Sequence, residues 1–185
     1  MKKIKQILLP YFGIILFMIA LFGANIIWKL IIYGDEDSPM VLLFNRFDIS
    51  APFVVMSEHI AKVVYIIIRF FGNEISLTEK VFLNFPSGYG VKIIWGCTGI
   101  KQTFIFLIIM LLARGNWKHK LWFVPVGIFC CYIINILRIA AITLIVKNHQ
   151  EFFEFYHGFV FKYLYYGLIF LMWLLWEEKI YRKNL

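Results

Sequence analysis

The stretch LWFVPVGIFCCYIINILRIAAITLIV, residues 121–146, is long and apolar enough to cross a bilayer, and Arg138 is its only charged residue. Burying a permanent cation in hydrocarbon costs at least ~2.5–3.5 kcal/mol, and arginine cannot lose its proton to avoid that cost. A charged residue at such a depth therefore needs a partner or a function, and we treat Arg138 as a functional-site candidate.

The composition of the whole chain places this stretch in an integral membrane protein. Of the 185 residues, 62% are hydrophobic, and the mean hydropathy is +0.78. This length is sufficient for one compact helical bundle and leaves no room for a second sizeable domain. The three cysteines form neither a CxxC motif nor a metal-ligand spacing, so we expect no disulfide framework, no metal and no cofactor.

The charged residues are separated along the chain by sign. The net charge is +8, and the basic residues cluster before the first apolar run, in one short connection and at the C-terminal end. These clusters are Lys2, Lys3 and Lys5; Arg114, Lys118 and Lys120; and Lys179, Arg182 and Lys183. Acidic residues follow the first apolar run instead, at Asp35, Glu36, Asp37 and Asp48. The positive-inside rule therefore predicts a multi-pass protein of the cytoplasmic membrane with both termini in the cytoplasm. No basic face remains for a nucleic-acid partner.

Four apolar runs predict transmembrane helices, at residues 7–32, 99–113, 121–146 and 159–176. The first run is too long for a typical signal-peptide core, so we interpret it as a retained anchor. The charged residues 177–185 are predicted to form a cytoplasmic tail. Residues 97–176 then make a core of three spans that carries the candidate functional residues.

Residues 34–96 are predicted to form an extracytoplasmic loop that has structure of its own. Within it, residues 53–71 are apolar but carry charges on one helical face, which is typical of an interfacial helix and leaves a fifth span as the alternative. These charges belong to Glu58, Lys62 and Arg69. Short strand-forming runs flank the turn sequence PSGYG, residues 86–90, and predict a small hairpin. The predicted fold is an all-α integral membrane protein with four transmembrane helices, one amphipathic or fifth helix, and this small extracytoplasmic hairpin.

Three side chains that could act together fall near one level of this bundle. Cys97 lies at the start of the second span and His157 at the start of the fourth, which places both at outer helix ends. Arg138 lies roughly 26 Å along its helix from the cytoplasmic end, about two turns below the outer end. Because a long side chain can snorkel toward the interface, we expect the three groups to meet at the outer face.

The residues around these three positions form ordered motifs. WGCTGIKQ at 95–102, NILRIAAI at 135–142 and YHG at 156–158 resemble, in this order and on successive spans, the exosortase/archaeosortase family. Members of that family are multi-spanning membrane proteins regarded as transpeptidases that process C-terminal sorting signals. The resemblance implies that Cys97, Arg138 and His157 are catalytic, with Thr98, Gly99 and Asn135 as flanking motif positions. Many members have more helices before the cysteine, so this chain resembles a minimal version.

The chemistry of the three residues fits peptide-bond cleavage through a thioester. A thiolate attacks a carbonyl far better than a thiol, and a neighbouring guanidinium favours the charged form of Cys97. Arg138 can also donate hydrogen bonds to the oxyanion of the tetrahedral intermediate. His157 can take the thiol proton and return it to the leaving amine. The expected partners are membrane-anchored proteins with a C-terminal sorting signal, within the lipid bilayer; the oligomeric state is left open.

Each assignment has a simpler alternative. Cys97 can be an inert interfacial thiol, and Arg138 can pair structurally with Glu151 or Glu154, or with backbone carbonyls. His149 lies in the same predicted loop as His157, but His157 opens a span and is followed by Gly158.

Lys101 is a further supporting candidate. It lies one helical turn after Cys97, where it can either assist the thiolate or snorkel outward.

Two other functions are open at this stage. A non-catalytic scaffold of an envelope-assembly or export complex needs none of this chemistry. A membrane thiol oxidoreductase needs a second reachable cysteine, whereas Cys130 and Cys131 are predicted to lie in the middle of a span.

Overall fold

The computed structural model describes residues 2–34, 39–147 and 149–181. Four helical stretches within these residues are long and apolar enough to cross a membrane: Phe12–Ile31, Ser50–Phe70, Trp117–Val146 and Phe153–Tyr181. A shorter apolar helix runs from Ile100 to Leu112. The predicted all-α integral membrane class is therefore confirmed. The predicted acidic cluster at Asp35, Glu36 and Asp37, and the last four residues of the predicted tail, lie outside the described residues.

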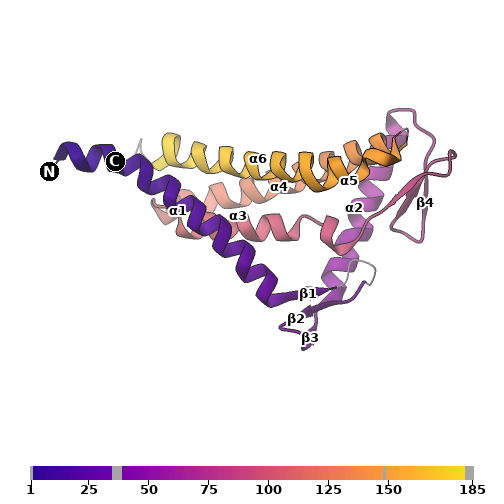
Figure 1. Ribbon diagram of the computed structural model, residues 1–185, viewed down its shortest axis with the longest axis horizontal. Coiled ribbons are helices and arrows are strands. Elements are labelled where there is room, and N and C mark those ends of the chain that lie inside the picture. Colours follow the sequence, from indigo (N-terminus) through magenta and orange to yellow (C-terminus); the bar gives the residue numbers. More distant parts are fainter. Residues whose placement is uncertain (1, 35–38, 148, 182–185) are drawn as a thin grey trace.

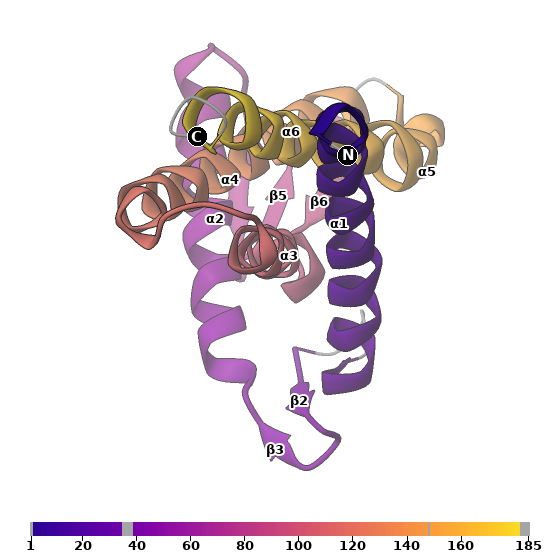
Figure 2. The same cartoon turned by 90° about the vertical axis from the view of Figure 1, so that its left-hand side faces the viewer.

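Four helices form the bundle, α1 (Lys2–Ile31), α3 (Ile100–Leu112), α4 (Trp117–Val146) and α6 (Phe161–Leu175). In Figure 1, α3, α4 and α6 run side by side along the long axis, and α1 slants across them. Figure 2 shows α3 end-on near the centre of the molecule. Buried apolar side chains of all four helices meet there in one cluster, which includes Phe17, Ile109, Cys131 and Ile169. Hydrophobic packing around α3 therefore holds the bundle together.

The two ends of the bundle differ in structure. One end carries the turn between α3 and α4 and the close of the last helix, and we call it the basic end because Arg114, Lys118 and Lys120 lie there (Figure 1). The other end carries two small β-sheets, and we call it the sheet end. α3 spans only about 20 Å at 1.5 Å per residue, whereas the thirty residues of α4 span about 45 Å. α3 therefore stops well short of the sheet end of α4.

Close contact between α3 and α4 depends on one glycine. An added Cβ on Gly127 of α4 would stand 2.1 Å from Cζ of Phe106 on α3. Small residues of this kind let membrane helices approach closely.

Helix α2 (Ser50–Phe70) crosses the sheet end instead of joining the bundle. Figures 1 and 2 both show it running transverse to α3, α4 and α6. One face is buried against α4 and the sheet of residues 76–92, through residues that include Ile60, Val64 and Ile68. α2 has the length and composition of a span, so its transverse direction is the feature that favours an interfacial helix over a fifth span.

The loop predicted at residues 34–96 contains more strand than expected. The predicted hairpin is present as β5 (Phe82–Asn84) and β6 (Gly90–Lys92), and β4 (Ser76–Thr78) completes an antiparallel sheet in the order β4–β5–β6. A second three-stranded antiparallel sheet, which was not predicted, joins β1 (Ile32–Gly34), β2 (Val41–Leu43) and β3 (Phe47–Asp48).

The last helical stretch is longer than predicted at both ends. It begins with α5 (Phe153–Phe155) and a π-helical turn, η3 (Tyr156–Val160), and continues after α6 as η4 (Trp176–Tyr181). His157 therefore lies inside the first turns of this helix instead of preceding it. The helix also includes Glu177, which was predicted to lie in the tail. Glu177 is buried and accepts a hydrogen bond from Nη2 of Arg114 at 2.7 Å, and this ion pair explains why the helix continues past residue 176.

Candidate active site

The candidate nucleophile Cys97 closes a short 3-10 turn, η1 (Trp95–Cys97), immediately before α3. Thr98 is buried, and its hydroxyl donates a hydrogen bond of 2.7 Å to the Trp95 carbonyl. Gly99 caps α3 with φ of 75°, in the left-handed region that favours glycine. The Cys-Thr-Gly sequence thus forms a tight turn that ends an extended segment and starts a helix.

Asn135 of α4 attaches this turn to the neighbouring helix. Its side chain is buried, and Nδ2 donates a hydrogen bond of 2.8 Å to the Cys97 carbonyl oxygen. A Cβ added to Gly99 would stand 2.9 Å from Cγ of Asn135, so only glycine fits under the amide without a shift. By these contacts, Thr98, Gly99 and Asn135 hold the turn that carries Cys97 in place beside α4.

Arg138 follows Asn135 by three residues, which places both on one side of α4. It lines a cavity of about 430 Å³ together with Cys97 and His157. The guanidinium is near enough to Cys97 and to His157 for its charge to act on both side chains. The predicted convergence of the three side chains is present in the structure. Cys97 immediately precedes the short helix α3, which lies beside α4, and this placement brings the cysteine to the cavity that Arg138 lines.

Arg138 has no carboxylate partner among the described residues. The ion pairs found there join Lys80 to Glu58, Arg114 to Glu177 and His149 to Glu151. The proposed structural pair with Glu151 is thus absent from this part of the chain, and Glu154 lines the cavity without forming an ion pair to Arg138. Nε of Arg138 is buried and has no hydrogen-bond partner among the described residues. The arrangement leaves a cation directed at a cavity that also holds a thiol and an imidazole.

His157 belongs to the π-helical turn η3, a feature often found at functional sites. Its imidazole is half-buried and stacks on the Phe153 ring, with centroids 5.2 Å apart and an interplanar angle of 10°. Gly158 lines the same cavity, and nothing lies within 4 Å of the position that its Cβ would occupy. The competing histidine, His149, is exposed, pairs with Glu151 and does not line this cavity.

Lys101 lies away from the cavity. It is not among the described lining residues, and the charges that act on it are those of Lys29 on α1 and Lys162 on α6. This placement favours the interpretation that Lys101 snorkels over the one in which it assists the thiolate.

Cys130 and Cys131 are also distant from this cavity, as expected for mid-span packing residues. Both are free thiols of α4, Cys131 is buried, and neither lines the cavity of Cys97. No other described cysteine is therefore positioned to exchange with Cys97.

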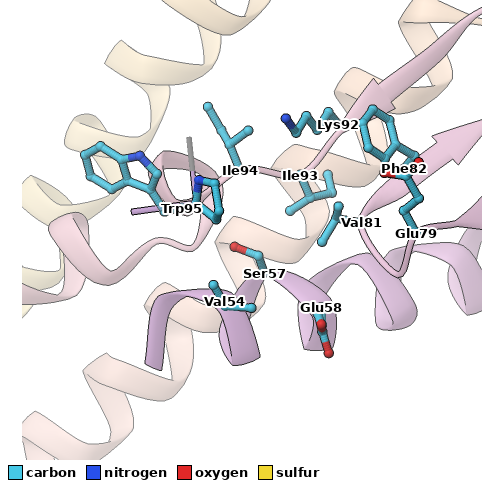
Figure 3. Close-up of a pocket in the computed structure, with 11 residues that line it drawn as sticks. Val54, Ser57, Glu58, Glu79, Val81, Phe82, Lys92, Ile93, Ile94 and Trp95 are labelled. Carbon is cyan, nitrogen blue, oxygen red and sulfur yellow. The ribbon is translucent and has the colours of Figure 1, made fainter. Parts of the chain in front are cut away.

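A second cavity of about 270 Å³ lies beside the first and was not predicted from sequence. Figure 3 shows it between α2, which contributes Val54, Ser57 and Glu58, and the extended segment of residues 92–95. Lys92, Ile93 and Ile94 line both cavities, so this segment forms the wall between them. The charges on α2 were the only sequence signal that pointed to this region.

The described residues contain no group of three or more His, Cys, Asp or Glu side chains that could hold a metal ion. The chemical groups gathered at the first cavity are instead a potential nucleophile, a potential general base and a fixed cation.

Comparison with known proteins identifies the family of this chain. A family model described as transmembrane exosortase matches residues 4–176, and the chain therefore belongs to the transmembrane exosortase family. The match includes the first span, which the motifs alone do not cover. Comparison with curated proteins and with solved structures gave no match. Membership supports a role in membrane-associated protein sorting or transpeptidation at the level of the family.

Proposed function

We propose that this member of the exosortase family is a cysteine transpeptidase or peptidase that cleaves C-terminal sorting signals of exported proteins. The observation that carries the proposal is the cavity lined jointly by Cys97, Arg138 and His157. Cysteine proteases need a thiol, a base and a group that stabilises negative charge, and these three side chains supply that set.

The proposed reaction begins with proton transfer from the Cys97 thiol to His157. The thiolate attacks the carbonyl carbon of the substrate peptide bond, and Arg138 donates hydrogen bonds to the oxygen that becomes negative. When the tetrahedral intermediate collapses, the C–N bond breaks and His157 protonates the leaving amine. The N-terminal part of the substrate remains attached to Cys97 as a thioester. An amine, another acceptor or water then attacks the thioester, and the thiol is regenerated.

We propose that the sheet end faces the outside of the cytoplasmic membrane. The described residues of the three basic clusters lie at the opposite end of the bundle, as the positive-inside rule requires of the cytoplasmic side. In this orientation α2 lies along the outer surface, where its charged residues Glu58, Lys62 and Arg69 remain at the interface. An exported substrate anchored by its own C-terminal span would then reach the cavity from outside.

Replacement of Cys97 tests the proposal. The assay is co-expression with an exported protein that ends in one apolar span and a basic tail, with loss of that C-terminal segment measured by mass spectrometry. Cys97→Ala and Cys97→Ser are expected to abolish processing while the protein remains inserted, and Cys130→Ala, the matched control, is expected to process normally. Unchanged processing by Cys97→Ala excludes the proposed mechanism. If Cys97→Ala instead restores full function to a deletion strain, the protein acts as a scaffold.

A further inference from the structure

Among the described residues, strand β6 has one unpaired edge. The sheet order is β4–β5–β6, so β6 forms strand pairs with β5 on one side only. Just beyond β6, the Ile93 amide donates a hydrogen bond of 2.9 Å to the Val81 carbonyl, which shows that this amide points toward the side of β5. Successive amides of an extended chain point in opposite directions. The amides of Lys92 and Ile94 therefore point away from β5.

This outer edge borders the cavity that holds the candidate nucleophile. Lys92, Ile93 and Ile94 line that cavity together with Cys97. The Cys97 amide donates a hydrogen bond of 2.9 Å to the Ile94 carbonyl, so the extended segment passes directly into the turn that positions the thiol. A peptide bound along this edge would reach the Cys97 sulfur without crossing another helix or strand.

Part of the cavity lining is apolar. Ile139 and Ile142 of α4 and Phe153 of α5 contribute to it beside the candidate catalytic residues, and the cavity volume is about 430 Å³. A space lined by a strand edge and by apolar side chains matches an extended peptide, whose backbone groups and side chains alternate in direction. Attack by a thiol favours the same conformation, because the carbonyls of a helix are already hydrogen-bonded within the helix.

We propose that the substrate segment at the cleaved bond binds as an added strand on the outer edge of β6. Its backbone pairs with the N–H and C=O groups of Lys92 and with the N–H group of Ile94, and an apolar side chain faces Ile139, Ile142 and Phe153. This inference rests on the proposed function and specifies how that function selects its substrate. The second cavity lies on the other side of the same extended segment and takes no part in this pairing (Figure 3).

Peptide probes of defined backbone chemistry test the proposal. The probe is an apolar tetrapeptide with a C-terminal vinyl sulfone, and its matched twin carries one N-methyl group on the amide expected to pair with the Lys92 carbonyl. Both are incubated with the full-length protein in detergent, and labelling of Cys97 is followed by intact-mass spectrometry with iodoacetamide in parallel. Loss of one hydrogen bond is expected to slow labelling by the methylated twin about tenfold, while iodoacetamide labelling shows that Cys97 is accessible. Equal rates for the two peptides overturn the proposal.

A substitution in the protein gives a second, independent measurement. Lys92→Pro removes the outward N–H but leaves the pairing with β5, and proline is tolerated on strand edges whose N–H is not used in the sheet. Lys92→Ala keeps the N–H and serves as the matched control. Both variants lack the lysine side chain and only Lys92→Pro lacks the N–H, so we expect peptide labelling of Lys92→Pro to be about tenfold slower than that of Lys92→Ala. Equal rates in the two variants contradict the strand addition.

The two proposals fail in different ways in this experiment. If Cys97 reacts with iodoacetamide no faster than Cys130, the thiol is not activated and the proposed function itself is wrong. If Cys97 reacts faster with iodoacetamide but does not distinguish the two peptides, only the strand addition is wrong.

Discussion

Two arginines at opposite ends of the bundle differ in the partners that surround them. At the basic end, Nη2 of Arg114 lies 2.7 Å from Oε1 of the buried Glu177, and the indole of Trp176 donates a hydrogen bond to the Arg114 carbonyl. The Arg114 guanidinium also lies over the rings of Phe12 and Tyr181. At the sheet end, Arg138 faces a thiol and an imidazole and has no ion pair among the described residues.

The difference separates a structural cation from one available for chemistry. The ion pair between Arg114 and Glu177 joins the α3–α4 turn to the end of the last helix. Because Glu177 neutralises the charge of Arg114, that charge is not available for chemistry. The charge of Arg138 is not neutralised by a carboxylate in the described chain, so it remains available to stabilise a thiolate or an oxyanion. The role of an arginine in an apolar span must therefore be inferred from its partners as well as from its depth.

The largest expected contrast is in activity. Arg138→Gln removes the cation and should lower processing by about 100- to 1000-fold, the usual effect of losing an oxyanion donor. Arg114→Gln is the matched control, and its activity per folded molecule should stay within about twofold of the wild type. Processing is measured at equal amounts of inserted protein. Equal losses in the two variants would show that the distinction between the arginines is wrong.

For the stability of the fold, the larger loss is expected at the basic end and not at Arg138. Glu177→Ala leaves Arg114 without its carboxylate and should destabilise the fold by about 2–3 kcal/mol. This is less than the loss expected for a fully buried pair, because Arg114 remains partly exposed to solvent. Arg138→Gln should be neutral or stabilising, since it removes an unneutralised charge. Thermal unfolding in detergent checks both variants, and a larger loss for Arg138→Gln than for Glu177→Ala refutes the assignment.

A smaller effect is expected when the attachment between the two helices is removed. Asn135→Ala deletes the hydrogen bond to the Cys97 carbonyl, worth about 1–3 kcal/mol when a buried acceptor is left unpaired. Processing should fall roughly tenfold as the thiol loses its position relative to Arg138. Ile133→Ala, on the exposed side of the same helix, is the control. Asn135 would be excluded as a positioning residue if the reactivity of Cys97 toward iodoacetamide and the processing rate both stayed unchanged.

The smallest effect is expected at Lys101. Because it faces Lys29 and Lys162 and not the cavity, Lys101→Gln should change processing by less than about twofold. A tenfold loss would restore the interpretation that Lys101 assists the thiolate.

The convergence of Cys97, Arg138 and His157 could be predicted because each residue has a definite depth in its span. The means of convergence could not be predicted. The predicted span at residues 99–113 already gave the start of α3 at Ile100 to within one residue. The hydrogen bond from the Asn135 amide to the Cys97 carbonyl could not be predicted, since it depends on how α3 packs on α4. The π-helical turn around His157 could not be predicted either, because no periodic pattern in the sequence indicates it.

The strands outside the predicted hairpin were missed for a local reason. Their turns place Phe44, Asn45, Glu79 and Lys80 at positive φ, where glycine or asparagine is the usual signal. Asn45 is the one such residue among the four, and its neighbour Phe44 gives no turn signal. The ion pair of Arg114 with Glu177 was missed for a different reason, because two residues far apart in sequence meet only after the helices pack.

The shortness of α3 also has a consequence for the surrounding lipid. A helix of about 20 Å cannot match a hydrocarbon layer of about 30 Å, so the bilayer thickness sets how far the Cys97 sulfur lies from the headgroups. Reconstitution into vesicles of increasing acyl-chain length should therefore lower turnover progressively, as hydrophobic mismatch grows. Membrane thickness would then act as a physical regulator of the protein.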